Sequence, residues 1–167
     1  LGLNNEIVGV TDFCDYPEAA LKKPRIGGFV NPSIEKIVSL KPDLIVGIKD
    51  GNRRETVQGL NDLGFSVYVV NPKGVDGVTK TVENIGEISG KHDESTKIVR
   101  HMMHKKERIV SLTRSLPKPK VFFQIGTAPI FTVGRGTLAD ELIRLAGGRS
   151  ISENEPMGYP LYSMETV

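Results

Sequence analysis

Two histidines are the candidates for metal chemistry in this sequence. His101 and His104 are three positions apart, so both could lie on one face of a helix. Imidazole pairs bind zinc when thiolates, carboxylates or further histidines complete the coordination shell. No third or fourth ligand is obvious, and a long helix would carry such residues on its polar side anyway. The sequence therefore predicts no metal site.

The loop 134–137, of sequence GRGT, is the strongest candidate for anion binding because a helix is expected directly after it. It lacks the lysine of a phosphate-binding loop and the full dinucleotide fingerprint. The single cysteine, Cys14, would need a base nearby to act as a nucleophile, and the nearest histidine in sequence is His92. We expect no catalytic residue. A small α/β enzyme that uses the 134–137 loop stays open as an alternative of another class.

Two glutamates occupy similar settings. Glu35 and Glu165 each follow a serine by two residues, in the segments NPSIE and PLYSME. The apolar residues that follow Ser33 share one helical face and are explained by packing, whereas Glu35 points elsewhere. The helix dipole alone favours a carboxylate in a first turn. An exposed carboxylate can also form bidentate hydrogen bonds with an arginine of a partner.

Composition excludes several classes of protein. The 167 residues are 38% hydrophobic and 25% charged with a net charge of +2, which is typical of a globular protein and does not favour nucleic-acid binding. No apolar stretch approaches the roughly 18 residues of a membrane span. No signal peptide is recognised, and we expect the chain to begin within a fold. One cysteine cannot form an internal disulfide, and without tryptophan any aromatic ligand contact must come from Phe or Tyr.

Turn residues divide the chain into alternating strands and helices. Strands are expected at 7–10, 44–48, 65–70, 121–125, near 131 and at 150–151, with a weak or extended segment at 26–29. Helices are expected at 18–21, 33–40, 53–63, 76–89, 93–116 and 138–145, and the tail is expected to begin another. Asn52 and Asp76 are the expected N-caps of two of these helices. The 93–116 helix would be about 36 Å long. This order predicts an α/β fold with parallel crossovers on both sides of one spanning helix.

Two segments resemble a known family. DYPEAALKKPRIGGFVNPSIEKIVSLKPDLIVG and VFFQIGTAPIFTVGRGTLADELIRLAGG are similar to the two lobes of periplasmic substrate-binding proteins of cobalamin and iron-complex ABC transporters, and VGVTDFCDYP is similar to the vitamin B12-binding branch. The resemblance implies two α/β lobes with parallel sheets, bridged by one long α-helix, with the second lobe incomplete. The implied domains are an N-terminal lobe at 1–92, a bridging helix at 93–116 and the start of a C-terminal lobe at 117–167.

The resemblance also implies a function and the residues that perform it. Such a protein captures cobalamin or a related corrinoid in an interlobe cleft and delivers it to the permease; a ferric siderophore or haem is the alternative ligand. Tyr16, beside Pro17, either faces the ligand or closes the turn, and Tyr16 and Tyr159 are the candidates for an axial ligand to haem iron. The implied ligand-binding residues are Phe13, Tyr16, Lys49, Asp50, Gly51, Asn52, Phe131 and Tyr159.

The implied partners follow from the same resemblance. Glu35 and Glu165 match the exposed glutamates with which each lobe docks onto arginines of the permease subunits. The small molecule is transported cargo, so no cofactor is expected. The implied location is periplasmic, or extracellular with a lipid anchor, with the signal segment outside this chain. Contact with the membrane would come only through the permease or the anchor, and no nucleic-acid partner is expected.

Overall fold

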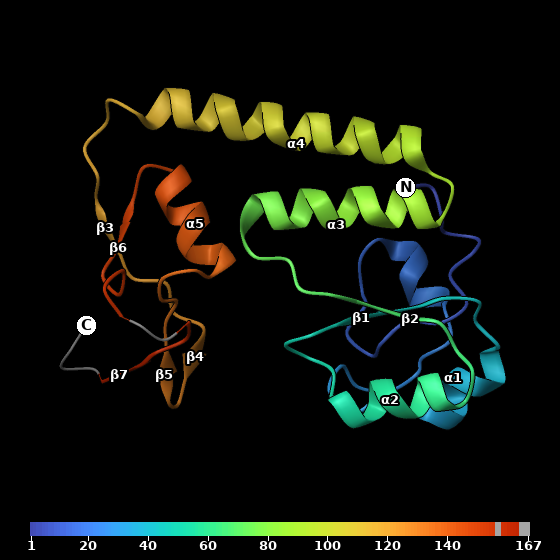
Figure 1. The fold of residues 1–167 in the computed structure, drawn as a ribbon. Helices are drawn as coiled ribbons and strands as arrows, with labels where there is room; N and C mark the ends of the chain where they lie inside the picture. Colours follow the sequence, from blue (N-terminus) through green and yellow to red (C-terminus); the bar gives the residue numbers. More distant parts are fainter. Residues whose placement is uncertain (156–157, 164–167) are drawn as a thin grey trace. The chain divides into compact units, whose positions relative to one another are not determined.

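The computed structural model describes residues 1–155 and 158–163. The chain divides into two compact units, Leu1–Asn71 and Pro72–Val167, each with its own strands and helices (Figure 1). No helix among the described residues is both long enough and apolar enough to cross a bilayer.

The first part of unit 1 is mostly loop. The 3-10 helix η1, Glu18–Lys22, forms where a helical turn is predicted. Val10 pairs with Arg25 as a parallel bridge, and Gly27 pairs with Pro32 as an antiparallel one. The strand predicted at 7–10 is therefore reduced to a single bridged residue.

Local signals define the helix α1, Ile34–Leu40. The hydroxyl of Ser33 accepts a hydrogen bond from the amide of Lys36, which makes it the N-cap. The helix ends at Lys41, which takes a left-handed conformation with φ of 46°. Since Pro42 follows, the right-handed α conformation that would continue the helix is disfavoured at Lys41. The predicted helix at 33–40 is confirmed.

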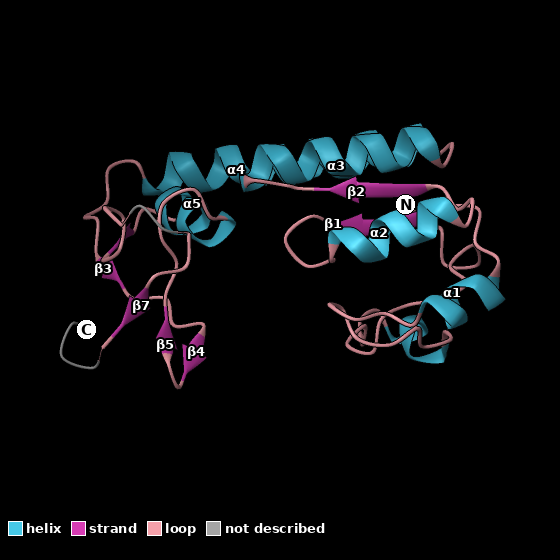
Figure 2. Cartoon of the chain, turned by 60° about the horizontal axis from the view of Figure 1, so that its bottom comes forward, coloured by secondary structure: helices cyan, strands magenta, loops and turns pink. Residues whose placement is uncertain are grey.

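A parallel strand pair carries the rest of unit 1. Strands β1, Ile45–Ile48, and β2, Val67–Val70, pair in parallel, and the helix α2, Arg54–Asp62, connects them (Figure 2). Strand, helix and parallel strand follow in the predicted order. Ile37 of α1 and Leu60 of α2 are the buried apolar residues of this unit.

Unit 2 begins with two long helices that pack side by side (Figure 1): α3, Gly74–Ile88, and α4, His92–Thr113. The 22 residues of α4 span about 33 Å. It ends at Thr113, before the predicted residue 116, where Pro117 disfavours a helical conformation at Leu116. The prediction that Asp76 caps α3 is wrong. Asp76 lies in the first turn, and its carboxylate pairs with Lys106 of α4 at 2.6 Å.

Two small sheets complete unit 2. The strand β3, Lys120–Val121, pairs in parallel with β6, Arg149–Ser150, which confirms the second parallel pairing. The helix α5, Leu138–Leu145, lies between them in sequence, with the predicted bounds. A three-stranded antiparallel sheet, β4-β5-β7, joins Gly126–Thr127, Ile130–Phe131 and Leu161–Tyr162 (Figure 2). The tail was predicted as a helix, and this is wrong for 161–162, whose backbone pairs with β5 instead.

Candidate ligand-binding loops

Three loops of unit 1 follow strand segments that pair in parallel. The loop 11–16 follows Val10, the loop 27–32 follows the strand segment at Arg25, and the turn 49–52 follows β1. Ligands of open parallel α/β sheets bind beyond the carboxyl ends of the strands. These loops are therefore the candidate ligand-binding surface of unit 1.

Arg25 holds the first of these loops. Its guanidinium Nη1 donates to the carbonyl oxygens of Thr11 and Cys14, at 2.7 and 2.9 Å. Charge-assisted hydrogen bonds of this kind are stronger than neutral ones. Both acceptors flank Phe13, whose side chain is 82% exposed. The backbone around Phe13 is thus fixed while its ring remains free to contact another molecule.

Tyr16 leaves the same loop and is 89% exposed. A side chain that exposed does not pack on the turn, so its phenol is accessible to a ligand. Cys14 is partly buried, and its sulfur lies 3.2 Å from the hydroxyl of Thr11. The partner in this contact is a hydroxyl, which is not a base that could take the thiol proton.

The side chain of Asn52 forms hydrogen bonds within the protein on both sides of the turn that follows β1. The side-chain oxygen of Asn52 accepts from the amide of Ile48 at 2.7 Å, and its amide nitrogen donates to the carbonyl of Phe29 at 2.9 Å. The prediction that Asn52 caps α2 is therefore wrong, since Arg53 occupies the N-cap position and makes no side-chain cap. The side chains of Lys49 and Asp50 are exposed at the tip of the turn.

Phe29 is a candidate ligand contact that the sequence prediction missed. Its ring lies against Gly51, where an added Cβ would stand only 1.9 Å from the ring Cζ. The side chain is still 43% exposed, so one part of the ring remains accessible. The signal that could have found it is an aromatic residue directly after Gly27 and Gly28, in a segment too rich in glycine to be a core strand.

In unit 2 the structure places Phe131 in β5 and Tyr159 in the bend that precedes the neighbouring strand β7. Phe131 belongs to β5 and pairs with Leu161 of β7. The chain beside Tyr159 continues this pairing, because Gly158 accepts from the amide of Gly134 at 2.9 Å. Phe131 is half-buried, and Tyr159 is 59% exposed. Tyr159 is therefore an accessible ring beside this sheet, while Phe131 serves partly as packing.

The 134–137 loop is engaged in capping α5. The hydroxyl of Thr137 accepts from the amide of Asp140 at 3.2 Å and donates to the carbonyl of Gly134 at 2.9 Å. Asp140 is only 2% exposed and places a carboxylate in the first turn of α5. An anionic ligand at this helix end would need positive charge instead. This geometry disfavours an anion site and, with it, the enzyme alternative.

The remaining candidates lie apart from these loops. Glu35 is exposed in the first turn of α1 and makes no ion pair within the described residues. Glu165 lies outside the described residues. His101 and His104 are exposed on α4, and the described part of the chain holds no group of three or more His, Cys, Asp or Glu suited to a metal ion.

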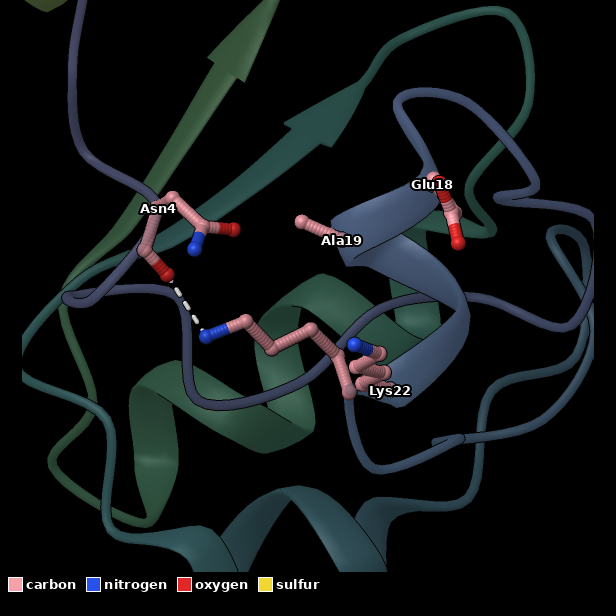
Figure 3. Close-up of a pocket in the computed structure, with 5 residues that line it drawn as sticks. Asn4, Glu18, Ala19 and Lys22 are labelled. Atoms are coloured by element: carbon pink, nitrogen blue, oxygen red, sulfur yellow. Dashed lines mark hydrogen bonds between the residues drawn. The ribbon is translucent and has the colours of Figure 1, made fainter.

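Two surface hollows also lie in unit 1, but neither includes a predicted ligand residue. The first, about 490 Å³, is shown in Figure 3 and is lined by Asn4, Glu18, Ala19, Lys22 and Lys23. Within it the ammonium of Lys23 donates to the backbone oxygen of Asn4 at 2.6 Å. The second, about 580 Å³, lies along the polar side of α2. Sites for small organic ligands are mostly apolar or aromatic, and charged linings of this kind do not match that chemistry.

Curated relatives and solved structures are similar to this chain. The vitamin B12-binding protein of Vibrio vulnificus is 29% identical over 166 residues, which cover 99% of this chain and 61% of the relative. That of Yersinia pestis is 30% identical over 170 residues, covering 99% of this chain and 59% of the relative. The structure of the periplasmic vitamin B12-binding protein BtuF of Vibrio cholerae matches with a TM-score of 0.86 and 29% identity, over 98% of this chain and 64% of that one.

Haem-binding proteins share the fold as well. The periplasmic haem-binding protein RhuT of Roseiflexus matches with a TM-score of 0.85 at 24% identity, over 95% of this chain and 63% of that one. The chain spans about three fifths of the length of the curated relatives it matches. The profile of one family, described as periplasmic binding protein, matches residues 1–167. Because this match runs through both units, the chain belongs to the periplasmic binding protein family.

Proposed function

We propose that this chain captures cobalamin or a related corrinoid for an ABC importer. The observation that carries the proposal is the 82% exposed ring of Phe13 on a loop whose carbonyls are bound by Arg25. A large flat ligand gains most from apolar area and from rings that are already in place. The relatives named for vitamin B12 binding support this ligand.

Each unit offers rings for such contacts. In unit 1 these are Phe13, Phe29 and Tyr16, and in unit 2 they are Tyr159 and the accessible part of Phe131. The turn that holds Lys49, Asp50, Gly51 and Asn52 lies beside Phe29 and extends the candidate surface of unit 1.

Haem is the second candidate ligand, and one observation favours it. The phenols of Tyr16 and Tyr159 are both exposed, and a tyrosine oxygen is a known axial ligand of haem iron. A ferric siderophore would use the same surface through its organic shell. The ligand is cargo in all three cases, and no further cofactor is proposed.

The direct test is a calorimetric titration of the full-length protein with cyanocobalamin, with haemin run in parallel. Saturable one-to-one binding of cyanocobalamin with no response to haemin is expected. A Phe13→Ala variant should bind at least tenfold more weakly, since a lost aromatic contact costs about 1.5 kcal/mol or more. Leu63→Ala removes another exposed apolar side chain, 58% exposed at the C-terminal end of α2, and serves as the control. A silent cyanocobalamin trace with a shifted haemin spectrum would move the assignment to haem.

Docking on a permease is the second part of the proposal. Glu35 offers an exposed carboxylate that makes no ion pair with any described residue, and we place Glu165 in the same role. Reversing both charges should abolish uptake and leave ligand affinity unchanged. Glu55→Arg is the matched control, because Glu55 is an exposed first-turn glutamate of α2 and has the same relation to a helix dipole. Equal loss of uptake in the control, or loss of ligand binding in the double variant, contradicts the docking role. In this proposal the protein works in the periplasm and contacts the membrane through the permease or a lipid anchor.

A further inference from the structure

Asn52 joins two backbone segments that are far apart in sequence. Its side-chain oxygen accepts from the amide of Ile48 at the end of β1, at 2.7 Å. Its side-chain nitrogen donates to the carbonyl of Phe29, 23 residues away, at 2.9 Å. One planar amide therefore ties the loop 27–32 to the end of a strand.

The ring of Phe29 is held from a second side. A Cβ at Gly51 would lie 1.9 Å from Cζ and 2.0 Å from Cε1 of Phe29, so the ring rests directly on the Gly51 backbone. The same position is 3.0 Å from the Cγ2 of Ile48, so the space beside Gly51 is filled by both side chains. The turn thus fixes Phe29 at two points: the Asn52 side chain binds its backbone carbonyl, and the Gly51 backbone contacts its ring.

We infer that Asn52 is a positioning residue, which acts on the ligand through Phe29 rather than by touching it. This inference rests on the proposed function, because it concerns the same ligand surface. Both halves of the Asn52 side chain are already used within the protein, the oxygen as an acceptor and the amide as a donor. Only one further donor hydrogen and one lone pair remain for any other contact.

The physical benefit is a ring that is ordered before the ligand arrives. A loop that must be ordered on binding subtracts that cost from the affinity, at about 0.5–1.5 kcal/mol for each immobilised side chain. The loop 27–32 contains two glycines and lies outside the helices and strands, and it is held at its ends, where Gly27 bridges to Pro32 and accepts from the amide of Asp12 at 3.0 Å. Asn52 adds a long-range hydrogen bond between those ends, at the carbonyl of Phe29.

Three variants test this role in the full-length protein. Asn52→Ala removes both hydrogen bonds. Asn52→Asp keeps the acceptor for Ile48 at neutral pH but cannot donate to the Phe29 carbonyl. Asn61→Ala replaces an exposed asparagine of α2 and is the matched control. The readouts are the cyanocobalamin affinity and the NMR shift of the Gly51 Hα protons, which the Phe29 ring should displace.

We expect both Asn52 variants to lose the ring-induced shift at Gly51 and to bind cyanocobalamin about tenfold more weakly. The amide of Ile48 should stay protected from exchange in Asn52→Asp and become unprotected in Asn52→Ala. The control should change neither the shift nor the affinity.

Two results would overturn the inference. Loss of affinity with an unchanged Gly51 shift would mean that Asn52 contacts the ligand itself. Loss of the shift with unchanged affinity would mean that the order of this loop is irrelevant to binding. If the wild-type protein does not bind cyanocobalamin, the proposed ligand is refuted instead. The same variants are then titrated with haemin, and the same two results would overturn the role of Asn52 with that ligand.

Discussion

Substituting Gly86 by alanine should separate the two long helices of unit 2. Gly86 lies in α3 where it meets α4, and an added Cβ would stand 2.2 Å from Oγ and 2.4 Å from Cβ of Ser95. It would also stand 3.0 Å from the backbone oxygen of Lys91. Ser95 is 1% exposed, and its Cβ is fixed to the helix backbone, so it cannot swing aside. The helices themselves must move.

The size of the effect follows from two opposing terms. Overpacking a tight contact costs about 1–3 kcal/mol, and contacts with a Cβ and a backbone oxygen place this site at the upper end. Replacing glycine by alanine inside a helix returns about 1 kcal/mol. The net loss in unfolding free energy should be about 2 kcal/mol, or roughly 4–8 °C in melting temperature for a chain of this size.

Gly59 provides the matched control, because the same substitution there should have the opposite sign. Gly59 lies inside α2, and the nearest atom to an added Cβ is Ile34 Cδ1 at 3.9 Å. Gly59→Ala should therefore stabilise the protein by about 0.5–1 kcal/mol. A helical glycine with space around it and one without should respond differently.

The assay is urea and thermal unfolding followed by circular dichroism, with native-state hydrogen exchange to localise the effect to α3 and α4. A Gly86→Ala/Ser95→Gly double variant should recover part of the loss, because it removes the two Ser95 atoms that the new methyl group meets but leaves the Lys91 backbone oxygen and adds a glycine inside α4. The reasoning is refuted if Gly86→Ala stabilises the protein as Gly59→Ala does. Failure of the double variant to recover stability would refute it as well.

Three further predictions follow from side-chain contacts. Burial, reinforced by the carboxylate of Glu155, raises the pKa of Tyr162 above its ordinary value of 10.0. Because the native protein then holds this proton to a higher pH than the unfolded protein, stability should fall as the pH rises from 10.0 through the raised pKa. Urea titrations at alkaline pH should show a smaller fall in Tyr162→Phe. Lys106→Met should cost less than about 1 kcal/mol in urea unfolding at low salt, and still less at high salt, because the Asp76 carboxylate with which Lys106 pairs is exposed. Arg25→Ala should lose about 2 kcal/mol or more in unfolding free energy, with faster hydrogen exchange in the loop it holds, while Arg25→Lys recovers part of both.

Elements with local signals could be predicted from the sequence. Thr137 caps α5, and Gly147 follows its end in a left-handed conformation, so both bounds are set by neighbours in the chain. The same is true of α1, between Ser33 and the Lys41-Pro42 step. The parallel pairing of β1 with β2 followed from a strand-helix-strand order, which depends on topology rather than on any single residue.

Elements that depend on distant partners could not be predicted from the sequence. β5 and β7 are two residues each and pair across about thirty residues of chain, so neither has a period that a sequence window could detect. The short polar side chains of Ser150 and Ser152 are almost wholly buried because the carbonyl of Val133 accepts a hydrogen bond from each hydroxyl. Local sequence gives no sign that these serines are interior.

The residues of the candidate site also differ in whether their roles depend on local sequence or on distant partners. Phe13 was indicated by the resemblance to the family, whereas Asn52 was assigned to a helix cap by a local rule and in fact bonds to a residue 23 positions away. A loop that must present a ring to a ligand cannot place its own backbone in a regular sheet, so its polar groups need partners from elsewhere in the chain. Those partners are ordinary asparagines and arginines, whose local context describes a cap or a surface charge. In a binding loop, the polar residues that local rules explain most easily are therefore the ones whose long-range partners most need to be checked.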